Sequence, residues 1–407
     1  MIDLVALVRR ALAAVAPEKL VRDALSHPKA QLLARQWQSG LVVISVGKAA
    51  TSMVEGAHTV LGPLVRHSVV VHPSGSPSPR RRPSQRSCSA PHPLPDERSV
   101  RAARGLVALV TRARLPVLAL VSGGASSLVA WPAKGISLEK KRSVVQSLLA
   151  SGAPIEDVNL VRRHLSRIKG GGLLRAAYPS PVHTLVISDV VAGRASDVGS
   201  GPSLPSPRGL RAARAAARRW LGAMAETLPL VPCVGPRDAE AAGSSHELLA
   251  SPERFARNVA HALAREGISA TVAPSGKGDL ETVARRILVL ARALQGPSAA
   301  VLSAEPTLEL PRGTIGKGGR ASHLALRIGP QLPRGVRALV VATDGVDGAS
   351  GHAGALVRRE AFVGYHQAVR SALATFDTGT LASKLGVAIT MPQGHNLTDL
   401  VVLVRDA

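Results

Sequence analysis

Small polar residues follow an apolar run in a pattern that suits the binding of a charged small molecule. The turn 122–127, Ser-Gly-Gly-Ala-Ser-Ser, ends the apolar segment 117–122 and precedes a helix-like stretch. Its backbone N–H groups are little covered by side chains, so the turn can bind an anion. In the alternative, glycine only permits a tight backbone path, and the turn alone does not decide between the two.

A lysine occupies a comparable position after another apolar run. Lys48 follows the run 41–46 and one glycine, where its ammonium group can neutralise a phosphate. The segment is not a P-loop, because Val42 and Ala49 stand where that motif requires glycine and a hydroxyl residue. A single lysine is more often solvated, so its position at the end of a run is what favours function.

A third basic stretch lies at 161–172, Val-Arg-Arg-His-Leu-Ser-Arg-Ile-Lys-Gly-Gly-Gly. Its cations, among them Lys169, converge on the glycine-rich end of a helix expected over 155–172. Taken alone, the pattern favours a basic helix with a glycine C-cap. His164 is interpreted as structural.

Acidic residues are fewer than basic residues in this chain, so an acidic residue at the end of an expected strand is informative. Asp189 follows the run 182–188, and Asp344 and Asp347 follow the run 336–342. Asp189 and Asp344 are candidates for Mg²⁺ ligation, and Asp189 also for accepting a hydroxyl proton. Asp347 is equally well explained as a turn former.

The composition bounds the class of protein. The net charge is +24, but the arginines are scattered along Ala-rich helices and aromatic residues make up only 2% of the chain. This favours solvated helix faces over a specific nucleic-acid surface. The two cysteines fit a reducing cytoplasm, and no apolar run reaches membrane-spanning length. We expect a cytoplasmic monomer or homodimer that acts on a small molecule and not on a membrane.

Apolar strands alternate with Ala/Arg/Leu helices, which predicts an α/β fold with mainly parallel sheets. A helix over 138–150 is predicted, with Ser137 as its cap. The Pro- and Ser-rich segment 72–95 is predicted to be a loop. A change of composition predicts two domains, 1–230 and 231–407.

These motifs together resemble the glycerate 2-kinase family, whose C-terminal part is known as the MOFRL domain. The resemblance covers most of the chain, in order, in the segments 46–53, 92–97, 121–128, 151–171, 185–190, 200–205, 316–320, 342–348 and 394–400. The blocks HLSRIKGG and TDGVDG are its specific parts. No GxGxxG follows a strand, which argues against the dehydrogenase implied by the older family name, hydroxypyruvate reductase.

The resemblance implies a Rossmann-like N-terminal domain, a C-terminal MOFRL-type domain, and transfer of the γ-phosphoryl group of ATP to the 2-hydroxyl of D-glycerate. It implies ATP and Mg²⁺ as cofactors. It assigns catalysis to Lys48, Asp189 and Arg320. Metal ligation falls to Asp189 and Asp344. The expected cofactor-binding residues are Ser122, Gly123, Gly124, Ser126, Lys169, Asn396 and Asp399.

The chain departs from the family pattern at three places. Arg194 stands in a turn that is usually acidic, the segment 303–307 keeps Glu305 but lacks the usual glycines, and Ala-Ser-His at 321–323 replaces Asn-Gln-Glu. Either the remaining acids suffice, or the substrate differs, or the chain is a catalytically degenerate relative that binds a nucleotide or an anionic metabolite.

Overall fold

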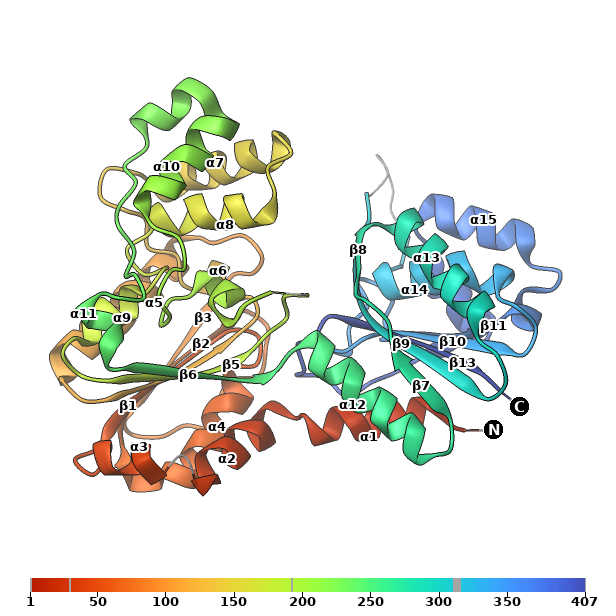
Figure 1. Ribbon diagram of the computed structural model, residues 1–407, viewed down its shortest axis with the longest axis horizontal. Helices are drawn as coiled ribbons and strands as arrows, with labels where there is room; N and C mark the ends of the chain where they lie inside the picture. Colours follow the sequence, from red (N-terminus) through yellow and green to blue (C-terminus); the bar gives the residue numbers. More distant parts are fainter. Residues whose placement is uncertain (1, 29–30, 192, 310–315, 407) are drawn as a thin grey trace. The chain divides into compact units, whose positions relative to one another are not determined.

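The structure is a computed structural model that describes residues 2–28, 31–191, 193–309 and 316–406 (Figure 1). Its contacts divide the chain into two compact units. We call Pro17–Ser188 with Gly193–Leu249 the first unit, and Met1–Ala16, Asp189–Ala192 and Ala250–Ala407 the second unit. The predicted boundary at residue 230 differs from this division, because the strand Ser244–Ala250 joins the sheet of the first unit.

The first unit is built on a sheet with the strand order β3-β2-β1-β4-β5-β6 among the described residues. The strands are β1 (Leu41–Val46), β2 (Val65–Pro73), β3 (Gln85–Ala90), β4 (Val117–Ser122), β5 (Val182–Ile187) and β6 (Ser244–Ala250). The pairs β2–β3, β1–β2, β1–β4 and β4–β5 are parallel. This is the order of the doubly wound Rossmann fold. In that fold ligands bind where the order of the strands reverses, here beyond the ends of β1 and β4.

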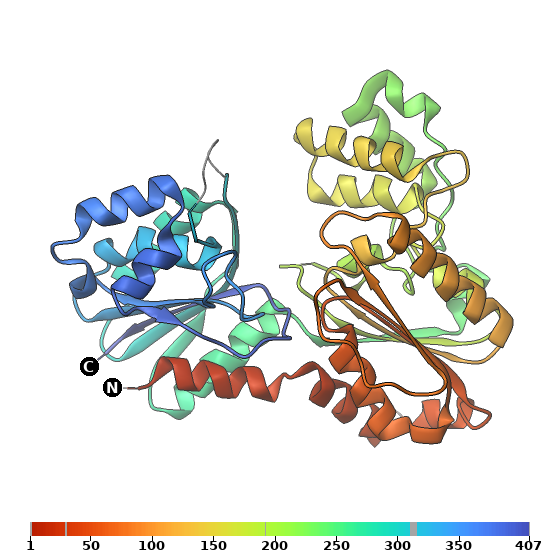
Figure 2. The same ribbon diagram turned by 180° about the vertical axis from the view of Figure 1, so that it is seen from behind.

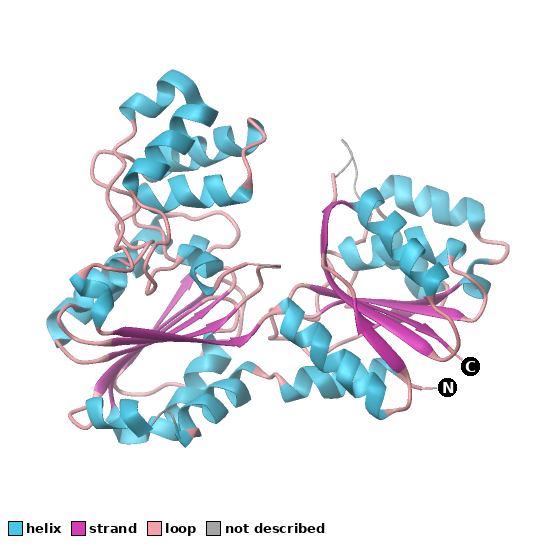
Figure 3. Ribbon diagram, viewed as in Figure 1, coloured by secondary structure: helices cyan, strands magenta, loops and turns pink. Residues whose placement is uncertain are grey.

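Helices cover both faces of this sheet (Figures 1 and 3). They include α2 (Pro17–Ser26), α3 (Gln31–Gln36), α4 (Ala50–Leu61), α5 (Glu97–Ala113), α6 (Ala125–Leu128), α9 (Gly172–Ala177) and α11 (Ala239–Ala242). A capping box at Asp96 starts α5, whose apolar side is buried. β1 and β4 are buried along their whole length, as their apolar sequences predict for central parallel strands.

Three further helices of the first unit form a group of their own, farther from the sheet (Figure 1). They are α7 (Leu138–Ala150), α8 (Ile155–His164) and α10 (Leu210–Leu221). Val144 and Leu148 of α7 pack with Val161 of α8 and Ala213 of α10 in one buried cluster. The predicted cap of α7 is confirmed, since the Ser137 side chain accepts a hydrogen bond from Lys140 N at 3.0 Å.

The second unit contains a sheet whose described strands run in the order β12-β11-β10-β13-β9-β7, with β8 paired to β9. Its strands are β7 (Ser269–Val272), β8 (Gly276–Asp279), β9 (Ser298–Thr307), β10 (Val336–Ala342), β11 (Gly354–Arg358), β12 (Ala388–Ile389) and β13 (Asp399–Arg405). The α/β class is confirmed, but mainly parallel pairing holds only for the first sheet. Here β9, β13, β10, β11 and β12 pair in antiparallel fashion, and only β7 and β8 run parallel to β9.

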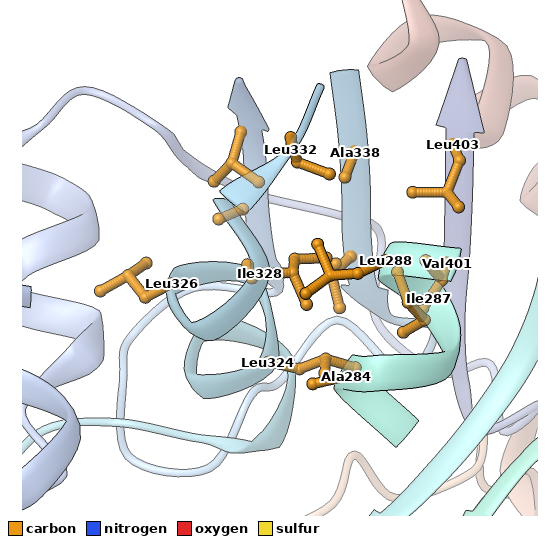
Figure 4. Packing of buried hydrophobic residues seen from close by; sticks show 14 of the residues in the cluster. Ala284, Ile287, Leu288, Leu324, Leu326, Ile328, Leu332, Ala338, Val401 and Leu403 are labelled. Carbon is orange, nitrogen blue, oxygen red and sulfur yellow. The ribbon is translucent and has the colours of Figure 1, made fainter. Parts of the chain in front are cut away.

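Helices pack on both faces of the second sheet, as the view from behind also shows (Figure 2). They include α1 (Leu4–Ala14), α12 (Pro252–Arg265), α13 (Leu280–Ala293), α14 (Arg320–Ile328), α15 (His366–Thr375) and α16 (Thr378–Lys384). Figure 4 shows side chains of α13 and α14, among them Ile287 and Ile328, against Ala338 of β10 and Leu403 of β13. Among the described residues, none forms a helix long and apolar enough to cross a bilayer.

Two local predictions are wrong. The segment 72–95 is not entirely loop, because 85–90 forms the edge strand β3, held by its pairing with β2 in spite of its polar sequence. The helix predicted over 155–172 ends at His164. The chain beyond it pairs with Trp131 and Pro132, since Arg167 N donates to Trp131 O at 2.9 Å and Ser166 bridges to Pro132.

Candidate active site

The loops after β1 and β4 hold each other in place by backbone contacts. Lys48 N donates to Gly123 O at 2.9 Å, and Ala49 N donates to Ser122 Oγ at 3.1 Å. Gly47 has φ +132°, and a Cβ there would lie 2.1 Å from Ser122 Oγ, so only glycine fits this close approach. Ser122 is fully buried, and its side chain therefore positions the turn that carries Lys48.

Gly124 lies between two basic side chains. It has φ +80°, and a Cβ added there would lie 3.1 Å from the His92 ring and 3.2 Å from Lys48 Cγ. Burial, and then the charge of Lys48, lower the pKa of His92. The helix α6 that follows has only four residues, so its dipole adds little to anion binding at this turn.

Lys169 reaches back to the same turn from the loop after α8. Its Nζ donates to Ser126 O at 2.6 Å, to Ser126 Oγ at 3.0 Å and to Val129 O at 3.3 Å. The side chain is buried, and burial, with the neighbouring cations Lys141 and Arg162, lowers its pKa strongly. The predicted cofactor-binding residues of the first unit thus lie together around the ends of β1 and β4.

The second unit gathers acidic residues around Arg320 at one edge of its sheet. Asp399 begins β13 and pairs with Ala342 of β10 and Ala304 of β9, so the antiparallel strand starts where β9 and β10 end. Arg320 Nε lies 3.3 Å from Asp399 Oδ2, and the Arg320 guanidinium also lies 4.0 Å from Glu305. The edge therefore combines one arginine with several carboxylates.

Burial dominates the electrostatics of Asp399. Burial, with a smaller contribution from the neighbouring acids Asp347, Asp344 and Glu305, raises the pKa of this carboxyl to about 7 against the opposing charge of Arg320. Among the described residues, Asp399 Oδ2 accepts no hydrogen bond, and its contact with Arg320 is an ion pair. The carboxyl is thus partly protonated at neutral pH, and a nearby cation would favour its ionised form.

Asp347 has a structural contact that explains its burial. Its two carboxylate oxygens accept hydrogen bonds from Ala321 N and Ser322 N, each at 2.8 Å, at the start of α14. These contacts hold the helix end that carries Arg320, which supports the interpretation of Asp347 as a structural residue.

The backbone before Asp399 is strained. Thr398 has φ +61°, an unusual conformation for a β-branched residue. Its carbonyl accepts hydrogen bonds from Thr343 N at 3.1 Å and Thr343 Oγ1 at 2.6 Å. Such strain persists where surrounding contacts impose it, and here the two hydrogen bonds from Thr343 hold the chain directly before Asp399.

Asn396 and Asp189 meet in the second unit, since Asn396 Nδ2 donates to Asp189 Oδ2 at 3.4 Å. Asp344 follows β10 and accepts from Val346 N at 3.2 Å. Within the described parts of the chain, no group of three or more His, Cys, Asp or Glu side chains has the arrangement of a metal site. A Mg²⁺ ion that is bound mainly by phosphate and water needs only one or two carboxylates, which these acids can provide.

The structure therefore assembles the predicted residues in two sets. Lys48, Ser122, Gly123, Gly124, Ser126 and Lys169 belong to the first unit, and Asp189, Arg320, Asp344, Asn396 and Asp399 belong to the second. In the first set the residues lie around one turn, while the second set contains the contacts of Arg320 with Asp399 and of Asn396 with Asp189. The site roles of both sets remain predictions.

Three residues near the first set were not predicted as site residues, although Arg162 belongs to the cations that the sequence indicated in the stretch 161–172. His92, Lys141 and Arg162 line a pocket together with Gly124, Ser126 and Lys169. A signal for Lys141 was present, because it stands three residues before Val144 and seven before Leu148, on the apolar side of α7.

Comparisons with known proteins agree with the motif order. Residues 3–227 match the family model described as a domain of unknown function, DUF4147, and residues 298–399 match the MOFRL family. The chain is 29% identical to D-glycerate 2-kinase of Thermotoga maritima, over 97% of this chain and 96% of that one. It is 30% identical to glycerate kinase of Homo sapiens, over 86% and 81% of the two chains.

Another relative bears the older name. A protein of Agrobacterium vitis named hydroxypyruvate reductase is 35% identical over 88% of this chain and 97% of its own. Among solved structures, the crystal structure of glycerate kinase from Thermotoga maritima superposes with a TM-score of 0.83 at 27% identity and covers 98% of both chains. The chain is therefore an enzyme, a kinase, and belongs to the glycerate kinase family.

Proposed function

We propose that the enzyme transfers the γ-phosphoryl group of ATP to the 2-hydroxyl of D-glycerate and so forms 2-phosphoglycerate. The observation that carries the proposal is the loop pair after β1 and β4, which holds Lys48 beside Gly123 and Gly124 at the switch point of a Rossmann-type sheet. The name of the Thermotoga relative, D-glycerate 2-kinase, supports the acceptor and the position of attack.

The proposed roles follow from the charges of the residues. Phosphoryl transfer requires positioning and charge neutralisation rather than a covalent nucleophile. Lys48 is proposed to neutralise charge on the transferred group, and Arg320 to bind a carboxylate or phosphate with its guanidinium fork. Asp189 is proposed to accept the proton of the 2-hydroxyl, and its contact with Asn396 orients the carboxylate.

The remaining predicted residues are proposed to hold the cofactors. Ser122, Gly123, Gly124 and Ser126 would form and support the phosphate-binding turn, while Lys169, Asn396 and Asp399 contribute charge and hydrogen bonds. Asp189 and Asp344 would hold Mg²⁺, which supplies neutralisation of the phosphate charge. The acidic surroundings that raise the pKa of Asp399 suit a bound cation.

One observation favours the second candidate, a degenerate relative that binds a nucleotide or anionic metabolite without turnover. Arg194 replaces a usual acid, and the nearby carboxylate of Asp197 is already engaged by Arg163 Nη2 at 2.6 Å and by Arg194 N at 2.9 Å. The turn at 193–197 therefore offers less free negative charge for a metal ion than the family pattern does.

An ADP-release assay with ATP, Mg²⁺ and D-glycerate tests the proposal, with phosphorus NMR of the product to identify the phosphorylated oxygen. Lys48→Ala is expected to lower kcat by about 10²–10³-fold, the usual cost of losing one transition-state stabilising group. Lys134→Ala, an exposed lysine of the same unit, is the matched control. If the wild-type protein turned over no faster than Lys48→Ala, while calorimetry still showed nucleotide binding, the degenerate alternative would be favoured.

A further inference from the structure

A pocket of about 330 Å³ lies within the first unit, beside the Gly124 turn. Its walls come from the segment before α5, from the loop carrying α6, and from α7 and α8 with the loop that follows. Four of the lining side chains are lysines or arginines, namely Lys141, Arg142, Arg162 and Lys169, and the imidazole of His92 is a fifth basic group. No aspartate or glutamate is among the described residues that line it.

Lys141 is the unusual member of this set. It lies on α7, is only 5% exposed, and its Nζ has no hydrogen-bond partner among the residues that the structure describes. A buried ammonium group without a partner is costly, and proteins retain such groups mainly when a counter-charge binds to them. Burial, and then the charge of Arg162, lower the pKa of Lys141 to about 7.

The other cations are held by neutral oxygens. All three N–H donors of Lys169 are used on Ser126 and Val129. Arg162 Nη2 donates to Asn159 Oδ1 at 2.5 Å and to Ser200 Oγ at 3.1 Å, while its buried Nε has no partner. These contacts orient the two cations but leave their charge uncompensated.

We propose that this pocket binds an oxyanion, a carboxylate or a phosphate group of a small molecule, with Lys141 Nζ as the direct donor and Arg162 and Lys169 as supporting charges. Lys141 Nζ makes no hydrogen bond to any described residue, whereas Arg162 and Lys169 spend donors on neutral oxygens, and the pocket is large enough for a small organic anion. The inference rests on the proposed function only for the source of the anion, which would be the hydroxy acid or the nucleotide.

Calorimetric titration of the full chain tests the proposal, with inorganic phosphate and D-glycerate as separate probes and sodium chloride as the reference salt. Lys141→Met is expected to weaken binding of the recognised probe by about 10- to 100-fold, the cost of one charge-assisted hydrogen bond. Lys140→Met removes an exposed lysine one residue away and should bind as the wild type does. A response to phosphate identifies a phosphate site, and a response to glycerate a carboxylate site.

Stability and protons provide readouts that a merely structural lysine would not give. Without any anion, Lys141→Met should unfold at the same temperature as the wild type or a higher one, because an unpaired buried charge is removed. With the anion, only proteins that retain Lys141 should gain thermal stability. At pH 8, wild-type binding should take up protons, seen as a dependence of the binding heat on the buffer, and Lys141→Met should not.

The outcomes separate this inference from the kinase proposal, because no turnover is needed to observe binding. The inference would be overturned if wild type and Lys141→Met bound the probes with equal affinity. It would also be overturned if chloride bound with the same affinity as phosphate and glycerate. If Lys141→Met fails to fold, Lys141→Gln takes its place in the titrations. If the protein bound the anion through Lys141 but showed no phosphoryl transfer, only the proposed transfer to D-glycerate would be refuted.

Discussion

Each unit gathers ionisable side chains near the end of its sheet, and the two groups of side chains have opposite net charge. In the first unit, Lys141, Arg162 and Lys169 line one pocket without a carboxylate among its described lining residues. In the second, Asp399 lies within reach of the charges of Glu305, Asp344 and Asp347, with Arg320 as the opposing cation. Each arrangement is costly when left uncompensated, which indicates that each is built for a charge that arrives with a ligand.

Burial shifts the pKa of one group in each set toward neutrality, from opposite directions. It lowers that of Lys141 to about 7 and raises that of Asp399 to about 7. An anion would restore the charge of the lysine, and a cation that of the aspartate. Phosphoryl transfer brings both kinds of charge, since its donor is a polyanion that carries a metal ion.

The largest expected effect tests the second unit's group of acids, which we call the acidic edge (Glu305, Asp344, Asp347 and Asp399). The test removes its cation, Arg320. Arg320→Ala is expected to lower kcat by about 10²–10³-fold, because a group that neutralises charge in the transition state is lost. Kinetics with ATP and D-glycerate measure the effect, and added guanidinium should restore part of the activity. Arg327→Ala is the matched control on α14, where Arg327 pairs with Glu281 away from Asp399.

An unchanged kcat in Arg320→Ala, together with the expected loss in Lys48→Ala, would mean that the acidic edge takes no part in the reaction. The comparison would then hold only as electrostatics and not as catalysis.

The fold was predictable where chain-local patterns and tertiary contacts agree. β1 and β4 are continuous apolar runs and appear within their predicted bounds, and Ser137 caps α7 as predicted. β3 was missed because its polar sequence has no strand pattern, and pairing with β2 alone imposes its conformation. The end of α8 at His164 was missed because contacts with Trp131 and Pro132 determine it.

The site was predictable only in part, for a similar reason. Sequence motifs and the family resemblance pointed to Lys48, Lys169 and Arg320, but not to Lys141. A lysine on the apolar side of a helix commonly extends its stem over the core and keeps its ammonium group in water. Only the packing of α7 against α8 shows that Lys141 Nζ is buried in a pocket. The spacing of Lys141 to Val144 and Leu148 places it on the apolar side of α7, but the burial of its ammonium group depends on tertiary contacts.

The protonation of Lys141 in the pocket can be tested through the pH dependence of protein stability. Since the folded pKa of Lys141, about 7, lies below the unfolded value near 10.5, the unfolded chain binds more protons between these values. The contribution of Lys141 to the free energy of unfolding should therefore rise with pH, by up to about 1.4 kcal/mol per pH unit above pH 7. His92, Arg142, Arg162 and Lys169, which share the pocket with Lys141, remain in place when Lys141 alone is replaced.

Urea unfolding of wild type and Lys141→Met between pH 6 and pH 9 measures this contribution as a difference, so that titration elsewhere in the protein cancels. The difference should be largest near pH 6, with the Met variant more stable, and should shrink as pH rises. Lys140→Met should differ from wild type by a constant amount. A difference for Lys141→Met that does not vary with pH would show that Lys141 keeps its proton in the folded protein as well as in the unfolded chain over this range.

The smallest expected effect concerns the helix that carries Lys141. Ser137→Ala removes the hydrogen bond from Lys140 N to the cap and should cost about 1 kcal/mol locally. Amide exchange at the start of α7 should accelerate about 5-fold, measured by mass spectrometry of its peptides, while peptides of α14 in the second unit serve as reference. Ser143→Ala, an exposed serine within α7, should leave exchange at the helix start unchanged. Because Val144 and Leu148 keep α7 packed in the buried cluster when its cap is lost, anion affinity should fall far less than in Lys141→Met. Equal losses of affinity in the two variants would mean that the order of α7, and not the charge of Lys141, controls binding in the pocket.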